Sequence, residues 1–170
     1  MRVVIRTLAV VVLCLALLAA PASAQVSTVV AGQSVAGIRI GGNVNDAISV
    51  LGALFEKQDT NSGKYTIYDW PLRPLLVIAE KESGRVVLVL VAFTDLYRTD
   101  RGIAGGSERQ AVESAYGRDF ASTESQSSIR IVYDSLGIAF DVAKVGVMSG
   151  RVVQIFVFVP GQWQQIIEGS

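Results

Sequence analysis

Apolar and polar positions follow one another along this chain with two different periods. In one segment, five apolar residues are spaced three and four positions apart, as on one face of a helix: Val44, Ala47, Ile48, Leu51 and Phe55. Gly52 interrupts this stretch, and glycine readily ends a helix because it adopts positive φ. The pattern therefore predicts an amphipathic helix that ends near Gly52.

Runs rich in β-branched and aromatic residues come after this helix and predict strands. The candidates in the N-terminal half are Tyr65–Trp70, Leu75–Glu80 and Arg85–Phe93. Those in the C-terminal half are Ile129–Tyr133, Ile138–Ala143 and Arg151–Val159. Two segments rich in Ser, Thr, Asp and Gly, 57–64 and 118–128, are predicted to be solvated connections.

The two halves share an internal repeat, displaced by about 65 residues. The segment Gly37–Gly42 recurs as Gly102–Ser107, and Gly52 has Gly117 as its counterpart. Because several ordered positions match at one displacement, we predict that the chain contains two copies of one unit.

The order of elements, a helix followed by three strands and then repeated, predicts an α+β fold. Residues 25–100 form the first repeat unit and residues 101–170 the second. In each unit a helix would precede a three-stranded antiparallel meander. We expect the helices of both units to pack on one face of the sheet.

The N-terminus has the pattern of a secretory signal peptide, residues 1–24. Two arginines precede an apolar run from Leu8 to Leu18, and the small residues Ala22-Ser23-Ala24 follow it. A membrane anchor is the alternative, but the run is shorter than the roughly 20 apolar residues that a span needs. The sequence thus predicts a secreted or periplasmic protein, cleaved near Ala24, with no stable membrane span after cleavage.

Composition removes several classes of function. The chain has no histidine, and its single cysteine, Cys14, lies in the predicted signal peptide. Zinc sites and thiol catalysis therefore lack their usual ligands. Equal numbers of basic and acidic residues, 15 each, give no indication of a nucleic-acid surface. Since no cofactor motif is recognised either, we predict a non-enzymatic protein without metal or cofactor.

The third strand of each unit is apolar on both faces, which is more than burial of one face requires. We assign one set to the side of the helices: Val87, Val89, Val91 and Phe93. The opposite side carries a second set: Leu88, Leu90, Phe156 and Phe158. Because large exposed apolar patches are unusual, something must cover this side. The chain itself, through residues 26–35 or the tail around Trp163, is one alternative, and a partner protein, a second copy or an apolar ligand is the other.

A second candidate group combines aromatic rings with a cation. Tyr68, Trp70 and Arg73 have the composition of a partner-binding rim. The alternative is that these strand aromatics only pack at a sheet edge.

Four positions of each repeat resemble a known motif. Ile38, Gly41, Ala47 and Gly52, repeated as Ile103, Gly106, Val112 and Gly117, resemble the helix-entry motif of small outer-membrane-assembly lipoproteins of the SmpA/BamE type. The pattern is also similar to that of the tandem-repeat β-lactamase inhibitor proteins. The resemblance implies helices on an antiparallel sheet, and a protein-binding role as an envelope-assembly accessory or an enzyme inhibitor.

Two features depart from these families. After signal cleavage the chain has neither the cysteine that the lipoproteins acylate nor the disulfides of the inhibitors. A carrier or sensor of an apolar small molecule is therefore kept as the alternative function.

Overall fold

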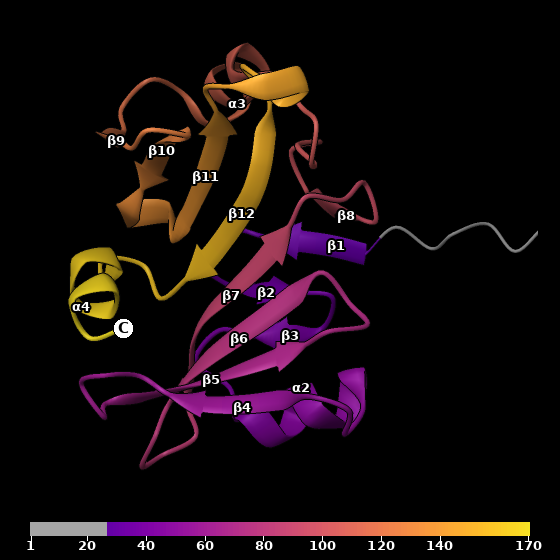
Figure 1. Ribbon diagram of the computed structural model, residues 1–170, viewed down its shortest axis with the longest axis vertical. Coiled ribbons are helices and arrows are strands. Elements are labelled where there is room, and N and C mark those ends of the chain that lie inside the picture. The colour runs from indigo at the N-terminus through magenta and orange to yellow at the C-terminus, as the bar shows by residue number, and fades with distance from the viewer. Residues whose placement is uncertain (1–26) are drawn as a thin grey trace, which may run out of the picture.

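The computed structural model describes residues 27–170, so the predicted signal peptide and Cys14 lie outside the described residues. The elements follow one another along the chain as labelled in Figure 1. The strands are β1 (Ser27–Val30), β2 (Ser34–Val35), β3 (Ile38–Arg39), β4 (Glu56–Asp59), β5 (Tyr65–Trp70), β6 (Leu75–Glu80), β7 (Val86–Ala92), β8 (Tyr97–Thr99), β9 (Ala121–Glu124), β10 (Ser128–Tyr133), β11 (Ile138–Ala143) and β12 (Val152–Phe158). The helices are α2 (Val44–Leu51), α3 (Arg109–Tyr116), α4 (Trp163–Glu168) and two 3₁₀ turns, η1 (Asp134–Leu136) and η2 (Gly146–Met148).

The strands form two sheets. The large sheet has eight antiparallel strands in the order β4-β5-β6-β7-β12-β11-β10-β9. Its two halves come from the two halves of the chain, and β7 and β12 join them at the centre (Figure 1). The small sheet has the order β3-β2-β1-β8, in which β1 and β8 run parallel.

Two apolar clusters lie on opposite faces of the large sheet. One is covered by the small sheet, by α2 and by α3, which contribute the fully buried Val29, Ala47 and Val112. The other is covered by α4, whose Ile166 is fully buried. We refer to this second side, which carries Leu88 and Phe158, as the α4 face.

This arrangement corrects the predicted α+β fold. The fold is mainly β, and each half contributes a meander of four strands to the large sheet, one more than predicted. The helices do not share one face, because α4 lies opposite α2 and α3. The additional strands, β4 and β9, lie in the segments predicted as solvated connections. All their residues are exposed at the sheet edges, so no apolar alternation marks them.

A β-bulge at the same place in each half changes which residues face inward. Val87 is the extra residue between β6 and β7, and Val153 is its counterpart between β11 and β12. As a result Val86 and Val89 both face α2 and α3, whereas Val87 lies on the α4 face. The assignment of Val87 to the helix side is therefore wrong, and Phe93 is 53% exposed.

Each long helix is tied to an aromatic residue of its own half. Trp70 Nε1 donates a hydrogen bond to the Gly52 carbonyl oxygen at 2.8 Å, and the Tyr133 hydroxyl donates to the Gly117 carbonyl oxygen at 2.7 Å. Gly52 and Gly117 have φ angles of 93° and 88°, which favour glycine. Burial raises the pKa of Tyr133 to about 12, so its hydroxyl stays protonated as a donor.

Candidate functional site

The four residues of the second apolar set, for which a binding partner was one predicted cover, are neighbours at the centre of the large sheet. Leu88 lies opposite Phe158, and Leu90 lies opposite Phe156. Leu88, Phe156 and Phe158 are buried, with exposed fractions of 2%, 5% and 0%. The Trp163 ring of α4 covers them, because its centroid lies 4.9 Å from that of Phe158 and 5.7 Å from that of Phe156. The chain itself therefore covers most of this set, and of its four residues only Leu90 is partly exposed.

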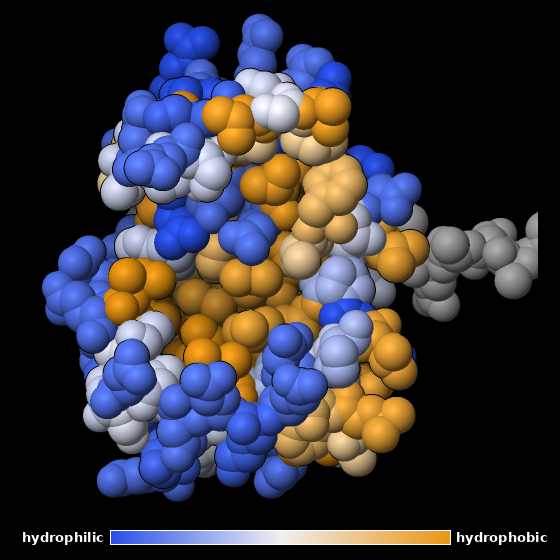
Figure 2. All heavy atoms as spheres, viewed as in Figure 1, coloured by the Kyte–Doolittle hydropathy of each residue, from blue (hydrophilic) through white to orange (hydrophobic). Residues whose placement is uncertain are grey.

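Figure 2 shows what remains open on this side of the sheet. Apolar atoms lie in a hollow across the middle of the molecule, and hydrophilic side chains surround it. The partly buried apolar strand residues on this side are Ile67, Leu76 and Leu90. Glu56 and Asp69 stand beside Ile67 at the β4 end. The open part of the α4 face is thus a recessed strip with a charged border.

The second predicted group is divided between the core and the surface. Tyr68 and Trp70 are 9% and 2% exposed, and their ring centroids lie 5.4 and 5.3 Å from that of Phe55. Arg73 is exposed in the turn between β5 and β6. Within residues 27–170 it forms no ion pair. The rings hold the turn in place, and the cation faces solvent.

Sequence reasoning missed the leucines around Arg73. A groove of about 500 Å³ lies between the end of α2, the β5–β6 turn and the segment that enters β8. It is lined by Leu51, Gly52, Leu54, Trp70, Leu72, Arg73, Pro74, Leu96 and Tyr97, and we name it the leucine groove. Leu54, Leu72 and Leu96 are 74%, 82% and 44% exposed. Figure 2 shows further apolar atoms at the lower right, beside the end of α2.

The corresponding turn of the C-terminal half is closed. There the backbone N–H of Trp163 donates to Asp134 Oδ1 at 3.1 Å, and the backbone N–H of Gly32 donates to the Gly137 carbonyl oxygen at 3.2 Å. Counted from the two glycines that end the helices, Gly52 and Gly117, Asp119 stands where the first half has Leu54. Counted from the two rings that bond to those glycines, Trp70 and Tyr133, Ser135 stands where the first half has Leu72. Exposed leucines around this turn are therefore a feature of one half only.

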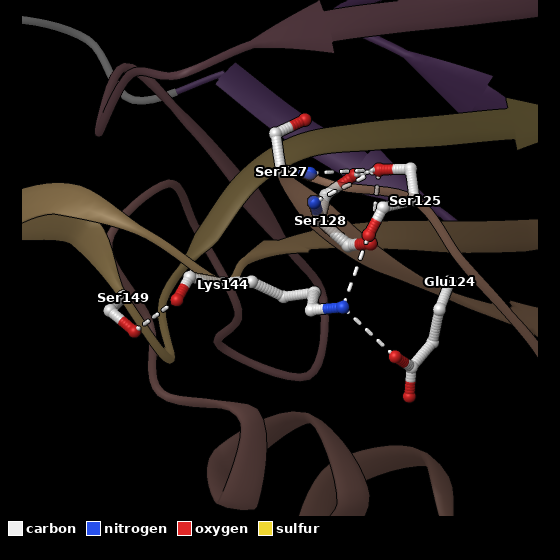
Figure 3. A network of polar contacts seen from close by, with 6 residues as sticks. All are labelled: Glu124, Ser125, Ser127, Ser128, Lys144 and Ser149. Carbon is white, nitrogen blue, oxygen red and sulfur yellow. Dashed lines mark hydrogen bonds and ion pairs between the residues drawn. The ribbon is translucent and has the colours of Figure 1, made fainter.

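A group of serines around Lys144 is arranged to hold a turn. Lys144 Nζ contacts Glu124 Oε2 at 3.0 Å and the Ser125 carbonyl oxygen at 3.1 Å (Figure 3). The Ser125 hydroxyl lies 3.1 Å from that of Ser128 and has no contact with the ammonium group in Figure 3. A lysine that activates a serine must take the proton of its hydroxyl. These contacts instead fix the turn between β9 and β10.

Other chemistry is sparse in the described part of the chain. Among residues 27–170, no group of three His, Cys, Asp or Glu side chains is placed to hold a metal ion. No helix in that range has the length and apolarity needed to cross a membrane.

Comparison with known proteins supports the fold and leaves the function open. No protein-family model matches the chain, and no curated protein matches it. It is similar in structure to the uncharacterized protein yfeY from Escherichia coli, with a TM-score of 0.56 and 13% identity, over 76% of this chain and 98% of that one. A DUF4309 family protein, YjgB from Bacillus subtilis, matches with a TM-score of 0.39 and 12% identity, over 69% of this chain and 78% of that one. At such identities the likeness to yfeY concerns the fold alone, and the resemblance to the SmpA/BamE unit stays a prediction.

Proposed function

We propose that this chain is a secreted or periplasmic, non-enzymatic module that binds another protein through the leucine groove. The observation that carries the proposal is the convergence of Leu54, Leu72 and Leu96, three exposed leucines from separate segments, on one groove. Leaving a large apolar side chain in water forgoes about 1.5–3 kcal/mol of burial free energy. A patch of this kind with a polar border is typical of an interaction site.

Arg73 indicates the chemistry of the partner. It lines the groove and has no acidic partner within residues 27–170. A charge at the edge of an apolar contact selects a partner of opposite sign. The partner segment is therefore apolar and carries a carboxylate next to its apolar side chains. Secretion is proposed on the basis of the predicted signal peptide. The proposed binding function has two specific forms, an envelope-assembly accessory and an enzyme inhibitor.

The test places a photo-reactive amino acid at Leu72 of the protein in the envelope fraction of its source organism. We expect one major cross-linked protein, and we expect Leu54→Ser or Arg73→Glu to reduce its yield about tenfold. The matched control is the same label at Val147, which is 98% exposed and lies in the other half of the chain.

Three results would contradict the proposal. Equal cross-linking from Leu72 and Val147 would show unspecific contact. Loss of the adduct with Leu90→Ser but not with Leu54→Ser would move the binding to the α4 face. An apolar small molecule recovered from the groove, with no protein adduct, would favour the carrier function.

A further inference from the structure

The large sheet ends in two edge strands, and the C-terminal edge is β9. All four residues of β9, Ala121–Glu124, are exposed. Unpaired N–H and C=O groups on such an edge are the groups that a further strand binds. The orientation of these groups therefore determines what β9 offers to a partner.

The hydrogen bonds of the β9–β10 hairpin identify the outward groups. The Ser125 N–H donates to the Ser128 carbonyl oxygen at 2.9 Å, so these residues form a hydrogen-bonded pair. Bonded and non-bonded pairs alternate along an antiparallel ladder. Thr123 is consequently bonded to β10, whereas the N–H and C=O groups of Ser122 and Glu124 point away from it. In the described part of the chain no strand lies on that side.

A second groove lies next to this edge on the α4 face. It has a volume of about 400 Å³ and is lined by Thr123, Glu124, Ser125, Ser128, Arg130, Trp163, Gln164 and Ile167. Ile167 is 40% exposed. Side chains along a strand point alternately to the two faces of the sheet. Each side chain points to the same face as the residue opposite it on the neighbouring strand. A strand added to β9 therefore points every second side chain to the groove side of the sheet, and one of these side chains lies beside Thr123, where the groove begins.

Arg130 makes the floor of this groove rigid and electrically neutral. Its Nε and Nη2 donate to Oδ1 and Oδ2 of Asp141, both at 2.6 Å, and the Asp141 side chain is 6% exposed. Its guanidinium lies 4.5 Å from the centre of the Phe156 ring and 5.5 Å from that of Trp163. Because the carboxylate balances the cation, the groove suits an apolar side chain better than an anion.

We propose that β9 is a strand-addition site for an extended peptide of another protein, and that one bulky apolar side chain of this peptide fills the groove beside Thr123. In this mode of recognition the main chain supplies affinity and the pocket supplies specificity. The proposal concerns a different surface from the leucine groove and does not depend on it.

A second copy of this chain fits the edge less well. When two β9 edges pair in antiparallel fashion, a residue whose N–H and C=O groups point away from its own β10 must lie opposite a residue of the same kind. A second β9 would then bring Ala121, Thr123 or Ser125 to the groove side. These side chains are too small to fill about 400 Å³.

The opposite edge of the sheet is guarded by charge. The Thr60 N–H donates to the Tyr65 carbonyl oxygen at 3.0 Å. By the same alternation, the β4 residues whose N–H and C=O groups point away from β5 are Lys57 and Asp59. Asp59 also pairs with Lys81 at 2.7 Å. Charged residues along an edge oppose strand addition. The corresponding positions of β9 carry one neutral residue, Ser122, and one charged residue, Glu124.

The test uses NMR spectroscopy of the purified protein and a capped peptide in which threonine and valine alternate around one phenylalanine. We expect the peptide to shift the amide signals of Ser122 and Glu124 and the indole signal of Trp163. Hydrogen exchange of the two amides should slow about tenfold. The same peptide with N-methyl groups on alternate residues should not bind, and this comparison needs no protein variant.

Two matched variants locate the site. Ser122→Pro removes an outward N–H and keeps the bonds to β10, so we expect peptide affinity to fall about tenfold. Lys57→Pro makes the same change on β4 and should leave affinity unchanged. Equal binding of a peptide with serine in place of phenylalanine would overturn the proposal, as would equal effects of the two variants. A concentration-dependent dimer that Ser122→Pro abolishes would identify a second copy as the occupant and overturn it too.

Discussion

Glu80 illustrates how a single surface pair makes stability depend on pH. Hydrogen bonds from the Arg85 guanidinium, at 2.6 Å, and from the Ser83 hydroxyl lower the pKa of Glu80 to about 2. The side chains of Glu80 and Arg85 are 28% and 42% exposed, so the contribution to stability is about 1 kcal/mol or less. The pair ties the end of β6 to the start of β7.

We predict that Glu80→Gln lowers the free energy of unfolding near neutral pH and has little effect at pH 2. The pKa of Glu80 is lower in the folded than in the unfolded chain, so its stabilisation is complete above about pH 5 and is lost as the pH falls toward 2. Urea unfolding between pH 2 and pH 7 measures the difference. Glu82→Gln, in the same turn, is the control, and an effect of Glu80→Gln that is constant with pH would contradict the prediction.

At the same scale, single residues show where sequence reasoning succeeded and where it could not. Gly52 ends its helix as predicted, because a positive φ is a local requirement that glycine meets. Leu54, Leu72 and Leu96 gave no signal, because one exposed leucine in a polar loop is ordinary. Only the folded chain brings the three leucines to one groove.

At the scale of elements, α4 is the feature that decides whether the α4 face is open. Its Ile166 is 0% exposed and packs in the cluster with Phe158, whereas the neighbouring Ile167 is 40% exposed. Thr60 Oγ1 and the Ser62 hydroxyl both donate to the Gly169 carbonyl oxygen. The short helix is thus held to both halves of the sheet.

We predict that Ile166→Ala lowers the free energy of unfolding by about 2–5 kcal/mol, because it leaves a cavity above Phe158. Ile167→Ala should cost less than about 1 kcal/mol, because its side chain is partly in water. Chemical unfolding of both variants measures the difference, and increased binding of a hydrophobic dye to Ile166→Ala would show the face opening. Equal costs for the two variants would mean that α4 does not seal the cluster.

The elements that sequence reasoning missed share a physical cause. β4 and β9 are exposed on both faces at the sheet edges, so neither burial nor alternation marks their sequences. The bulges at Val87 and Val153 insert one residue into an otherwise alternating strand. Both neighbours of Val87, Val86 and Leu88, are apolar, so the change of face left no trace in the pattern of that strand. The central strands themselves were predictable because their apolar runs are long.

At the scale of the whole molecule, the two halves are parts of one sheet. β7 and β12 pair over five positions, from Leu88 opposite Phe158 to Ala92 opposite Gln154. The core on the side of α2 and α3 includes residues from both halves. The repeated order of strands could be read from the sequence, but the pairing that joins the halves could not, because no local pattern specifies which strands meet.

We predict that residues 25–100 and residues 101–170 do not fold when they are produced separately. Separation exposes the apolar edges of β7 and β12 and divides both clusters, which removes burial that a small chain cannot replace. The intact chain should unfold in one cooperative transition. Calorimetry and NMR spectra of the intact chain and of each part provide the measurement. A well-dispersed spectrum from either part alone would show that the halves are independent domains.

The start of the described chain has a practical consequence for anyone who labels this protein. The Ser27 N–H donates to the Leu96 carbonyl oxygen at 2.8 Å, and Leu96 lines the leucine groove. An affinity tag or fluorophore fused upstream therefore joins the described chain at a residue whose backbone bonds to the groove lining. A tag at Ser170 instead follows α4, whose Gln164 and Ile167 line the groove beside β9, so each binding assay should carry its tag at the end away from the groove that it tests.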